Sequence, residues 1–397
     1  MPLDLSGKQW PPQIKGVGVD FLHASYVAEG QMIALPLGFP GMDMPIPPDE
    51  AYVTALGIDE RQVLYGGTGG RKAHLFAALT RGITGAVIDM AVLEENARTT
   101  AVLVARDGRV FATTAPGGPR PDADPQAVAG EGEGAVYVHD PMGLPYDLIQ
   151  EWGFAQTPAR KAAVPLPGEG IACAVMVRGP DDSERICGLS EKTGTLFIYD
   201  VSSAQAEALR PVDERGLFSK TIVVGPDGMV YGTGLAGRLW RLDPGGKRLE
   251  TTGLSIPSQA GREVRNHADS FAVDHTRRII YGGGAADGVL FAFDPAAGTV
   301  RSLGKATCYR GVKGLGVTPD GRLYGVSGRA GDIGHLFRYD PDAHELKDLG
   351  MIAAVFGARV YGYEFSGSVV GRDGQVFFGQ HERGGHVWIY WPALRRV

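Results

Sequence analysis

The chain has 397 residues, of which 44% are hydrophobic and 21% are charged, and its formal net charge is -6. This balance is typical of a globular protein. It argues against a nucleic-acid partner, since no block of Lys or Arg is present to neutralise phosphates. No apolar run approaches the roughly 18 residues that a membrane span needs. The first residues lack a basic stretch followed by an apolar one, so we expect a cytoplasmic protein without a secretory signal.

Taken in chain order, the expected elements begin with residues 1–48, a segment that includes an extended stretch within 23–36. Residues 49–397 then carry a sevenfold repeat, expected to form a single domain. Each copy has an apolar strand, a tight turn, a second strand often ending in Tyr-Gly, and an aromatic third strand. The third strands fall at 74–76, 136–141, 196–200, 238–244, 290–295, 336–341 and 387–390.

This repeat predicts an all-β fold, a seven-bladed β-propeller. Asp-Gly turns supply the positive φ that a two-residue hairpin needs, and repeats of roughly 40–50 residues with about four strands each are typical of propeller blades. The last copy ends soon after its third strand, so we expect the N-terminal segment to supply the missing outer strand and close the ring. Two packed β-sandwiches fit the repeat less well. Six or eight blades remain open if the insert at 115–134 hides a miscount.

The chemistry is expected at one mouth of the central channel. The loops that lead into each blade and those that join its second and third strands share that face, and five histidines fall on it: His74, His267, His335, His381 and His386. Cations there outnumber anions, which favours an anionic ligand. His74, His335 and His386 take the same repeat position, which favours a structural role for the last two and leaves His74 open.

Three motifs give the chain a family resemblance. Tyr65-Gly-Gly-Thr-Gly-Gly-Arg-Lys-Ala-His74-Leu-Phe, the Gly-His-Leu-Phe around His335, and Glu382-Arg-Gly-Gly-His386-Val-Trp-Ile-Tyr-Trp-Pro resemble the seven-bladed polysaccharide lyases. That group includes the ulvan lyases and the rhamnose–glucuronate lyases. The resemblance implies β-elimination at a uronic acid of an anionic oligosaccharide. Such lyases tend to use two histidines of blades one and two; His74 matches one, whereas Glu94 stands where the second is expected.

The resemblance and the predicted positions together suggest roles for individual residues. His74 and His267 are the acid–base candidates, with Tyr309 or Tyr361 as the alternative base. The candidates for binding the substrate and neutralising its carboxylate are Arg215, Arg265, Asn266, Arg310, His381 and Arg383.

Three other functions stay open at this point. One is a carbon–oxygen lyase similar to the streptogramin-inactivating enzymes, which use Mg²⁺; another is a metal hydrolase similar to gluconolactonase. The third is a propeller that only binds a partner. No ligand spacing in the sequence identifies a metal site, so Ca²⁺ or Mg²⁺ is considered without assigned residues.

Overall fold

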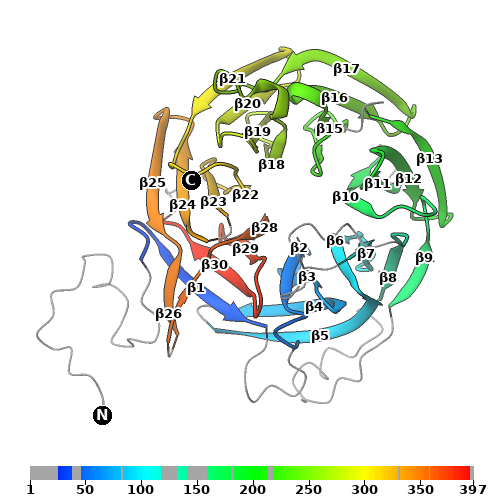
Figure 1. Cartoon of the computed structure of the whole chain (residues 1–397), viewed down its shortest axis with the longest axis horizontal. Helices are drawn as coiled ribbons and strands as arrows, with labels where there is room; N and C mark the ends of the chain where they lie inside the picture. The colour runs from blue at the N-terminus through cyan, green and yellow to red at the C-terminus, as the bar shows by residue number, and fades with distance from the viewer. Residues whose placement is uncertain are drawn as a thin grey trace, which may run out of the picture.

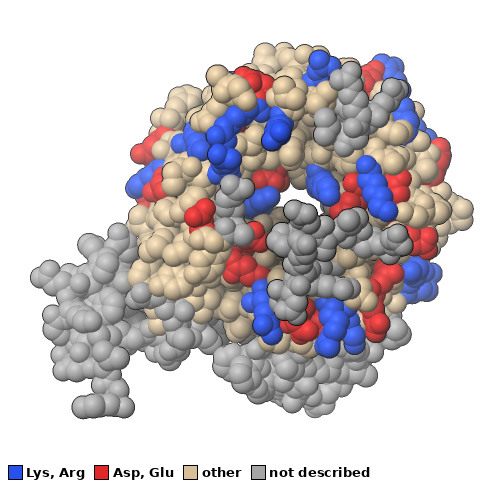
Figure 2. Space-filling model, viewed as in Figure 1, with Lys and Arg blue, Asp and Glu red and all other residues tan. Residues whose placement is uncertain are grey.

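Seven four-stranded blades, two of which join in one eight-stranded sheet, surround a central channel in the computed structural model of the chain (Figure 1). The residues that it describes are 26–37, 46–81, 84–117, 132–140, 159–179, 183–212, 218–329, 331–356 and 358–393. Figure 2 shows the opening at the centre of the ring, with basic and acidic side chains beside one another around it. The propeller predicted from the repeat is confirmed.

Every blade is an antiparallel sheet whose strands follow one another outward from the channel. Blades one and two share the single residue pair Gly69–Arg98 and so form one continuous sheet. Blade one comprises β2 (Tyr52–Ile58), β3 (Leu64–Gly69), β4 (Lys72–Arg81) and β5 (Thr84–Glu95), and blade two comprises β6 (Ala97–Val104), β7 (Val110–Pro116), β8 (Val136–His139) and β9 (Arg160–Ala163).

The next four blades repeat this order. Blade three comprises β10 (Ile171–Arg178), β11 (Glu184–Ser190), β12 (Thr195–Asp200) and β13 (Gln205–Pro211), and blade four comprises β14 (Val223–Val224), β15 (Val230–Thr233), β16 (Arg238–Asp243) and β17 (Arg248–Ser255). Blade five comprises β18 (Ala268–Asp274), β19 (Ile279–Gly284), β20 (Leu290–Asp294) and β21 (Thr299–Gly304), and blade six comprises β22 (Gly314–Val317), β23 (Leu323–Arg329), β24 (Asp332–Asp340) and β25 (Glu345–Met351).

Blade seven is built from both ends of the chain. It comprises β28 (Phe365–Val370), β29 (Val376–Gln380), β30 (His386–Trp391) and, as its outer strand, β1 (Gln31–Pro36). A hairpin of β26 (Ala353–Phe356) and β27 (Ala358–Tyr361) precedes it. The helices of the described chain are two three-residue 3-10 turns, η5 (Leu235–Gly237) and η6 (Glu263–Arg265). No described helix is therefore long and apolar enough to cross a membrane.

The glycine of the Tyr-Gly repeat makes room for the aromatic ring of the next strand. Gly232 pairs with Trp240 across the ladder, and a Cβ on Gly232 would lie 2.2 Å from the indole. Gly325 faces Phe337 in the same way, with a separation of 2.4 Å. A side chain at either glycine would force the ring away, since packed cores contain few voids. This close packing explains why the repeat combines glycine with aromatic residues.

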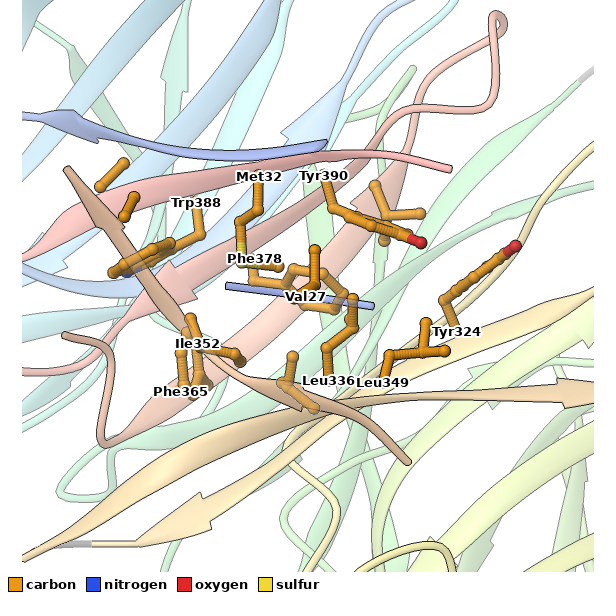
Figure 3. Packing of buried hydrophobic residues seen from close by; sticks show 14 residues of the cluster. Val27, Met32, Tyr324, Leu336, Leu349, Ile352, Phe365, Phe378, Trp388 and Tyr390 are labelled. Carbon is orange, nitrogen blue, oxygen red and sulfur yellow. The ribbon is translucent and has the colours of Figure 1, made fainter. Parts of the chain in front are cut away.

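The N-terminal segment closes the ring, as the sequence predicts. β1 pairs with β30 over its whole length, from Gln31–Trp391 to Pro36–His386. Val27 and Met32 enter a buried cluster with Trp388 of blade seven and Leu349 of blade six (Figure 3). The segment therefore bridges two blades, and burial of these apolar side chains stabilises the closure.

Candidate active site

Three cations that lie at or just before the start of first strands are each paired with an acid: Arg98 in β6, and Lys220 and Lys313 in the connections before β14 and β22. Arg98 and Lys220 both contact Glu191, with Lys220 Nζ 3.0 Å from its carboxylate. Lys313 Nζ lies 2.8 Å from Asp269 Oδ1. The sequence predicts a mouth in which cations outnumber anions, but these ion pairs offset much of that positive charge. Attraction of an anion must then come from individual groups more than from the mouth as a whole.

His74 is buried between two carboxylates. Its Nδ1 donates to Asp89 and its Nε2 donates to Glu50, both at 2.9 Å. Burial acts to lower the pKa of His74, but the two carboxylates outweigh burial and raise it. The ring is thus held as a cation with both nitrogens occupied. This environment indicates a structural role and offers no free nitrogen to a substrate, so His74 takes no part in the mechanism proposed below.

The three candidates of blade five lie in different environments. Asn266 is buried, where its amide donates to the Pro257 carbonyl and accepts from the Ala286 amide, each at 3.2 Å. These bonds hold two loops together, so Asn266 is placed to support the backbone and not to bind a ligand. His267 is half-buried without a side-chain hydrogen bond to any described residue, and Arg265 is exposed at the end of η6.

His381 directly follows β29, the second strand of blade seven. Its ring meets Tyr52 edge to face at 5.9 Å, and its backbone amide donates to the Glu364 carbonyl at 2.9 Å. Burial lowers the pKa of His381, and the charges of Arg98 and Lys313 act in the same direction. The Nδ1 atom is buried without a partner among the described residues. Because this nitrogen is buried, the structure gives no exposed atom of the His381 ring that is placed to bind a ligand.

The other candidates are scattered. Arg310 and Arg383 are exposed, and Tyr361 packs at 6.4 Å against Tyr363. Arg215 lies outside the described residues. The structure therefore does not gather all the predicted residues into one constellation.

Blade six carries a histidine–aspartate pair beside Tyr309. His335 Nδ1 lies 2.9 and 3.0 Å from the two oxygens of Asp348. A carboxylate only accepts, so Nδ1 carries the proton, and in the neutral ring Nε2 is left as an acceptor. No described residue hydrogen-bonds to that Nε2. The His335 side chain is 24% exposed, and its ring meets the ring of Tyr309 edge to face at 5.3 Å.

A β-bulge brings Asp348 to His335. Leu336 pairs with Gly350, but the next residue, Phe337, pairs with Asp348, so Leu349 is the extra residue of β25. Asp348 also accepts from the Gly350 amide at 2.9 Å, which fixes its carboxylate within the bulge. Gly350 has a φ of +113°, a conformation that glycine adopts without strain. Bulges of this kind re-aim side chains beside functional sites.

Tyr309 remains protonated near neutral pH. Burial raises the pKa of its hydroxyl, and the charges of Cys308, Asp332 and Asp348 act in the same direction. A protonated phenol beside an imidazole with a free nitrogen provides a proton donor and a proton acceptor in one place. This pairing is the chemistry expected of an acid–base site.

No metal site emerges from the side chains that the structure describes. Across the described ranges, no group of three or more His, Cys, Asp or Glu side chains is arranged to hold a metal ion. The Ca²⁺ or Mg²⁺ considered from the sequence thus has no assigned ligands in this part of the chain.

Sequence reasoning selected Tyr309 but favoured a structural role for His335 and overlooked Asp348. A signal was nevertheless present. His74 and His335 precede the same Leu-Phe pair, and each is followed by an aspartate, Asp89 or Asp348, in the fourth strand of its blade. Aligning the copies strand by strand would have identified both pairs.

The comparisons with known proteins concern the fold. No protein-family model and no curated protein sequence matches the chain. Among solved structures, a catalytically inactive virginiamycin B lyase from Staphylococcus aureus is similar with a TM-score of 0.57 and 7% identity, over 91% of this chain and 99% of that one. The periplasmic gluconolactonase of Pseudomonas aeruginosa has a TM-score of 0.54 and 15% identity, over 83% of this chain and 99% of that one.

A third similar structure is the extracellular domain of a protein described as a one-component system from B. thetaiotaomicron. Its TM-score is 0.55 and its identity 14%, and the match covers 91% of this chain and 40% of that one. At such identities the likeness confirms the propeller alone, because one fold hosts many unrelated functions. The lyase activity expected from the sequence motifs stays a prediction.

Proposed function

We propose that the chain is a carbon–oxygen lyase that cleaves a uronate-containing oligosaccharide by β-elimination at Tyr309, His335 and Asp348. One observation carries the proposal: an imidazole is fixed on a carboxylate through Nδ1, its Nε2 is open, and its ring lies against a protonated tyrosine. In contrast, His74 presents no open nitrogen.

In the proposed reaction His335 is the base. Its Nε2 removes the C5 proton of the uronate, and the electron pair of that C–H bond forms the C4–C5 double bond. The C4–O bond breaks, and the departing oxygen takes the proton of the Tyr309 hydroxyl. The imidazolium then loses its proton to solvent while the phenolate is reprotonated, which restores both groups. Asp348 stabilises the imidazolium while it exists.

The C5 proton becomes acidic only when the neighbouring carboxylate is neutralised. Arg310 follows Tyr309 directly and has an exposed side chain, so we assign it this task. A guanidinium binds a carboxylate through two parallel hydrogen bonds, and positive charge placed there stabilises the enolate-like transition state.

The first test is an activity assay. The protein is incubated with a panel of uronate oligosaccharides, with and without added Ca²⁺ or Mg²⁺, and the ultraviolet absorbance of the unsaturated product is followed. We expect product from at least one uronate and none from the matching neutral sugars. No product under any condition would reject the proposal and favour a non-catalytic binding role.

Variants then locate the site. His335→Ala and Tyr309→Phe should each lower kcat by about 10²-fold or more, the usual contribution of acid–base catalysis. Asp348→Asn should lower kcat and shift its pH profile, because the amide changes the tautomer and basicity of His335. His267→Ala tests the alternative base, and we expect it to retain activity. Full activity in His335→Ala, with loss in His267→Ala, would move the site to blade five.

A further inference from the structure

The opposite mouth of the channel contains a cavity of about 470 Å³. It is lined by the final residues of the first strands and the turns that follow them. All seven first strands start at the mouth that carries Lys313 and His381, so their ends gather at the other mouth. The cavity is therefore separate from the Tyr309–His335 site. Its volume lies within the range of small-molecule sites.

Half-buried apolar side chains form the wall of this cavity. Ile58, Val273, Val317 and Val370 come from the ends of β2, β18, β22 and β28. Their branched side chains offer a nonpolar surface to the body of a small ligand, and covering that surface would favour binding.

Three acids line the cavity: the exposed Glu60, and Asp59 and Asp274, which are already committed to the protein. Asp59 accepts from the Val63 amide at 2.8 Å and from Arg61 Nε at 2.9 Å. Asp274 accepts from Arg277 through its backbone amide at 2.8 Å and its Nη1 at 3.0 Å. Both aspartates are buried. These carboxylates cap turns, and their charge is offset by their own arginines, so they oppose an incoming anion only weakly.

Two arginines of the lining keep hydrogen-bond donors to spare. Arg372 Nη2 donates to the Glu60 carbonyl at 2.9 Å, and Arg178 Nε donates to Glu184 at 3.2 Å. A guanidinium has five N–H groups, and the remaining ones on both side chains have no acceptor among the described residues. Arg178 belongs to blade three and Arg372 follows the first strand of blade seven, so they approach the cavity from different blades.

We propose that this cavity binds a small organic anion, about the size of one sugar ring, through Arg178 and Arg372. The acid group, a carboxylate or a phosphate, would accept bidentate hydrogen bonds from the guanidinium groups, while the ring lies on the apolar wall. The exposed imidazole of His275 at the rim supplies one further polar contact. The site goes beyond the proposed lyase reaction and does not depend on it.

The test measures binding of three probes by calorimetry: glucuronate, glucose 6-phosphate and glucose. We expect one or both anions to bind and glucose not to bind. Each of Arg178→Gln and Arg372→Gln should weaken the affinity by about tenfold, the value of one charge-assisted contact. The double variant should abolish binding. Arg301→Gln, at an exposed position on the outer strand β21, is the matched control and should bind like the wild type.

Two further measurements keep the test decisive. Repeating the titrations in an Arg310→Gln background, which lacks the carboxylate-binding residue assigned to the lyase site, should leave the affinity unchanged, and a loss of binding there would overturn the proposal. Thr276→Trp narrows the cavity from an exposed position without altering either arginine, and it should also weaken binding. Equal binding of glucose, unchanged affinity in the folded double variant, or no binding of either anion would overturn the proposal, whatever the outcome of the lyase assay.

Discussion

Blades one and six carry the same histidine–aspartate pair in two different environments. In both, the histidine precedes the third-strand Leu-Phe pair, and the aspartate pairs with that phenylalanine across a bulge. The distance from Nδ1 to the aspartate is 2.9 Å in each. In blade one Glu50 occupies the second nitrogen and the ring is buried. In blade six the second nitrogen has no hydrogen-bond partner among the described residues, and the ring lies beside Tyr309.

The comparison teaches that the repeat position alone does not decide the role of the histidine. Both pairs are built by the same bulge, so the fold supplies the orientation of the ring. What differs is the residue brought to Nε2 by the loop that leads into the blade. A second carboxylate turns the pair into a buried ion cluster, and its absence leaves a base that a ligand can reach.

The largest expected effect is a difference in stability between the His74→Ala and His335→Ala variants. His74→Ala leaves Asp89 and Glu50 buried without their cation, so the free energy of unfolding should fall by about 3 kcal/mol or more. His335→Ala removes a partly exposed pair and should cost less than about 1 kcal/mol. Urea denaturation of both variants measures the difference. Equal losses would mean that the two pairs do not differ as described.

A smaller effect is expected when one of the two carboxylates that contact His74 is removed. Glu50→Gln removes one of the two carboxylates, so the pKa of His74 should decrease and the stability should fall by about 1–2 kcal/mol. An NMR titration of the His74 ring reports the pKa. Glu345→Gln, at an exposed position on β25, serves as the control and should leave the His74 titration unchanged. An unaltered pKa in Glu50→Gln would show that Glu50 does not hold the ring as a cation.

The smallest effect is a pH window for the blade-one cluster. The pKa of His74 is raised in the fold, so its contribution is complete below the ordinary value of 6.5 and is lost as pH rises through the raised value. For Glu50, burial acts to raise the pKa, but hydrogen bonds from Arg71 and His74 lower it. Its contribution is present above 4.5 and is lost as pH falls through the lowered value.

The gap in unfolding free energy between the wild type and His74→Ala should therefore be widest between pH 4.5 and 6.5 and narrow on both sides. Denaturation midpoints across the pH range measure it. A gap that keeps widening above pH 8 would contradict the assignment of His74 as a buried cation.

The fold follows from local patterns that can be recognised directly in the sequence. Tyr-Gly and aromatic strands recur because glycine on one strand faces a ring on the next, as Gly232 faces Trp240. The strand missing from the last copy predicts the closing role of the N-terminal segment. Every blade repeats the same pattern of glycine and aromatic residues, so the period of that pattern along the chain was enough to predict the ring.

The site was harder to predict, because it depends on contacts between segments that no local pattern describes. The sequence cannot show that Glu50 reaches His74, 24 residues away, or that Asp348 reaches His335 through a bulge. Likewise Asn266 looks like a substrate ligand until its amide is seen to support two loops. Charges that seemed to form a positive mouth are paired in the fold, as with Lys313 and Asp269.

The shared construction of blade seven also constrains how the molecule assembles. The Tyr390 hydroxyl donates to the Glu29 carbonyl, a contact between residues 361 apart in the chain. Joining points so distant costs several kcal/mol of chain entropy. During synthesis the early strand must wait for the final blade before it finds its partner. Until then its apolar side chains have no permanent cover, so the period before ring closure is when the nascent protein is most exposed to aggregation.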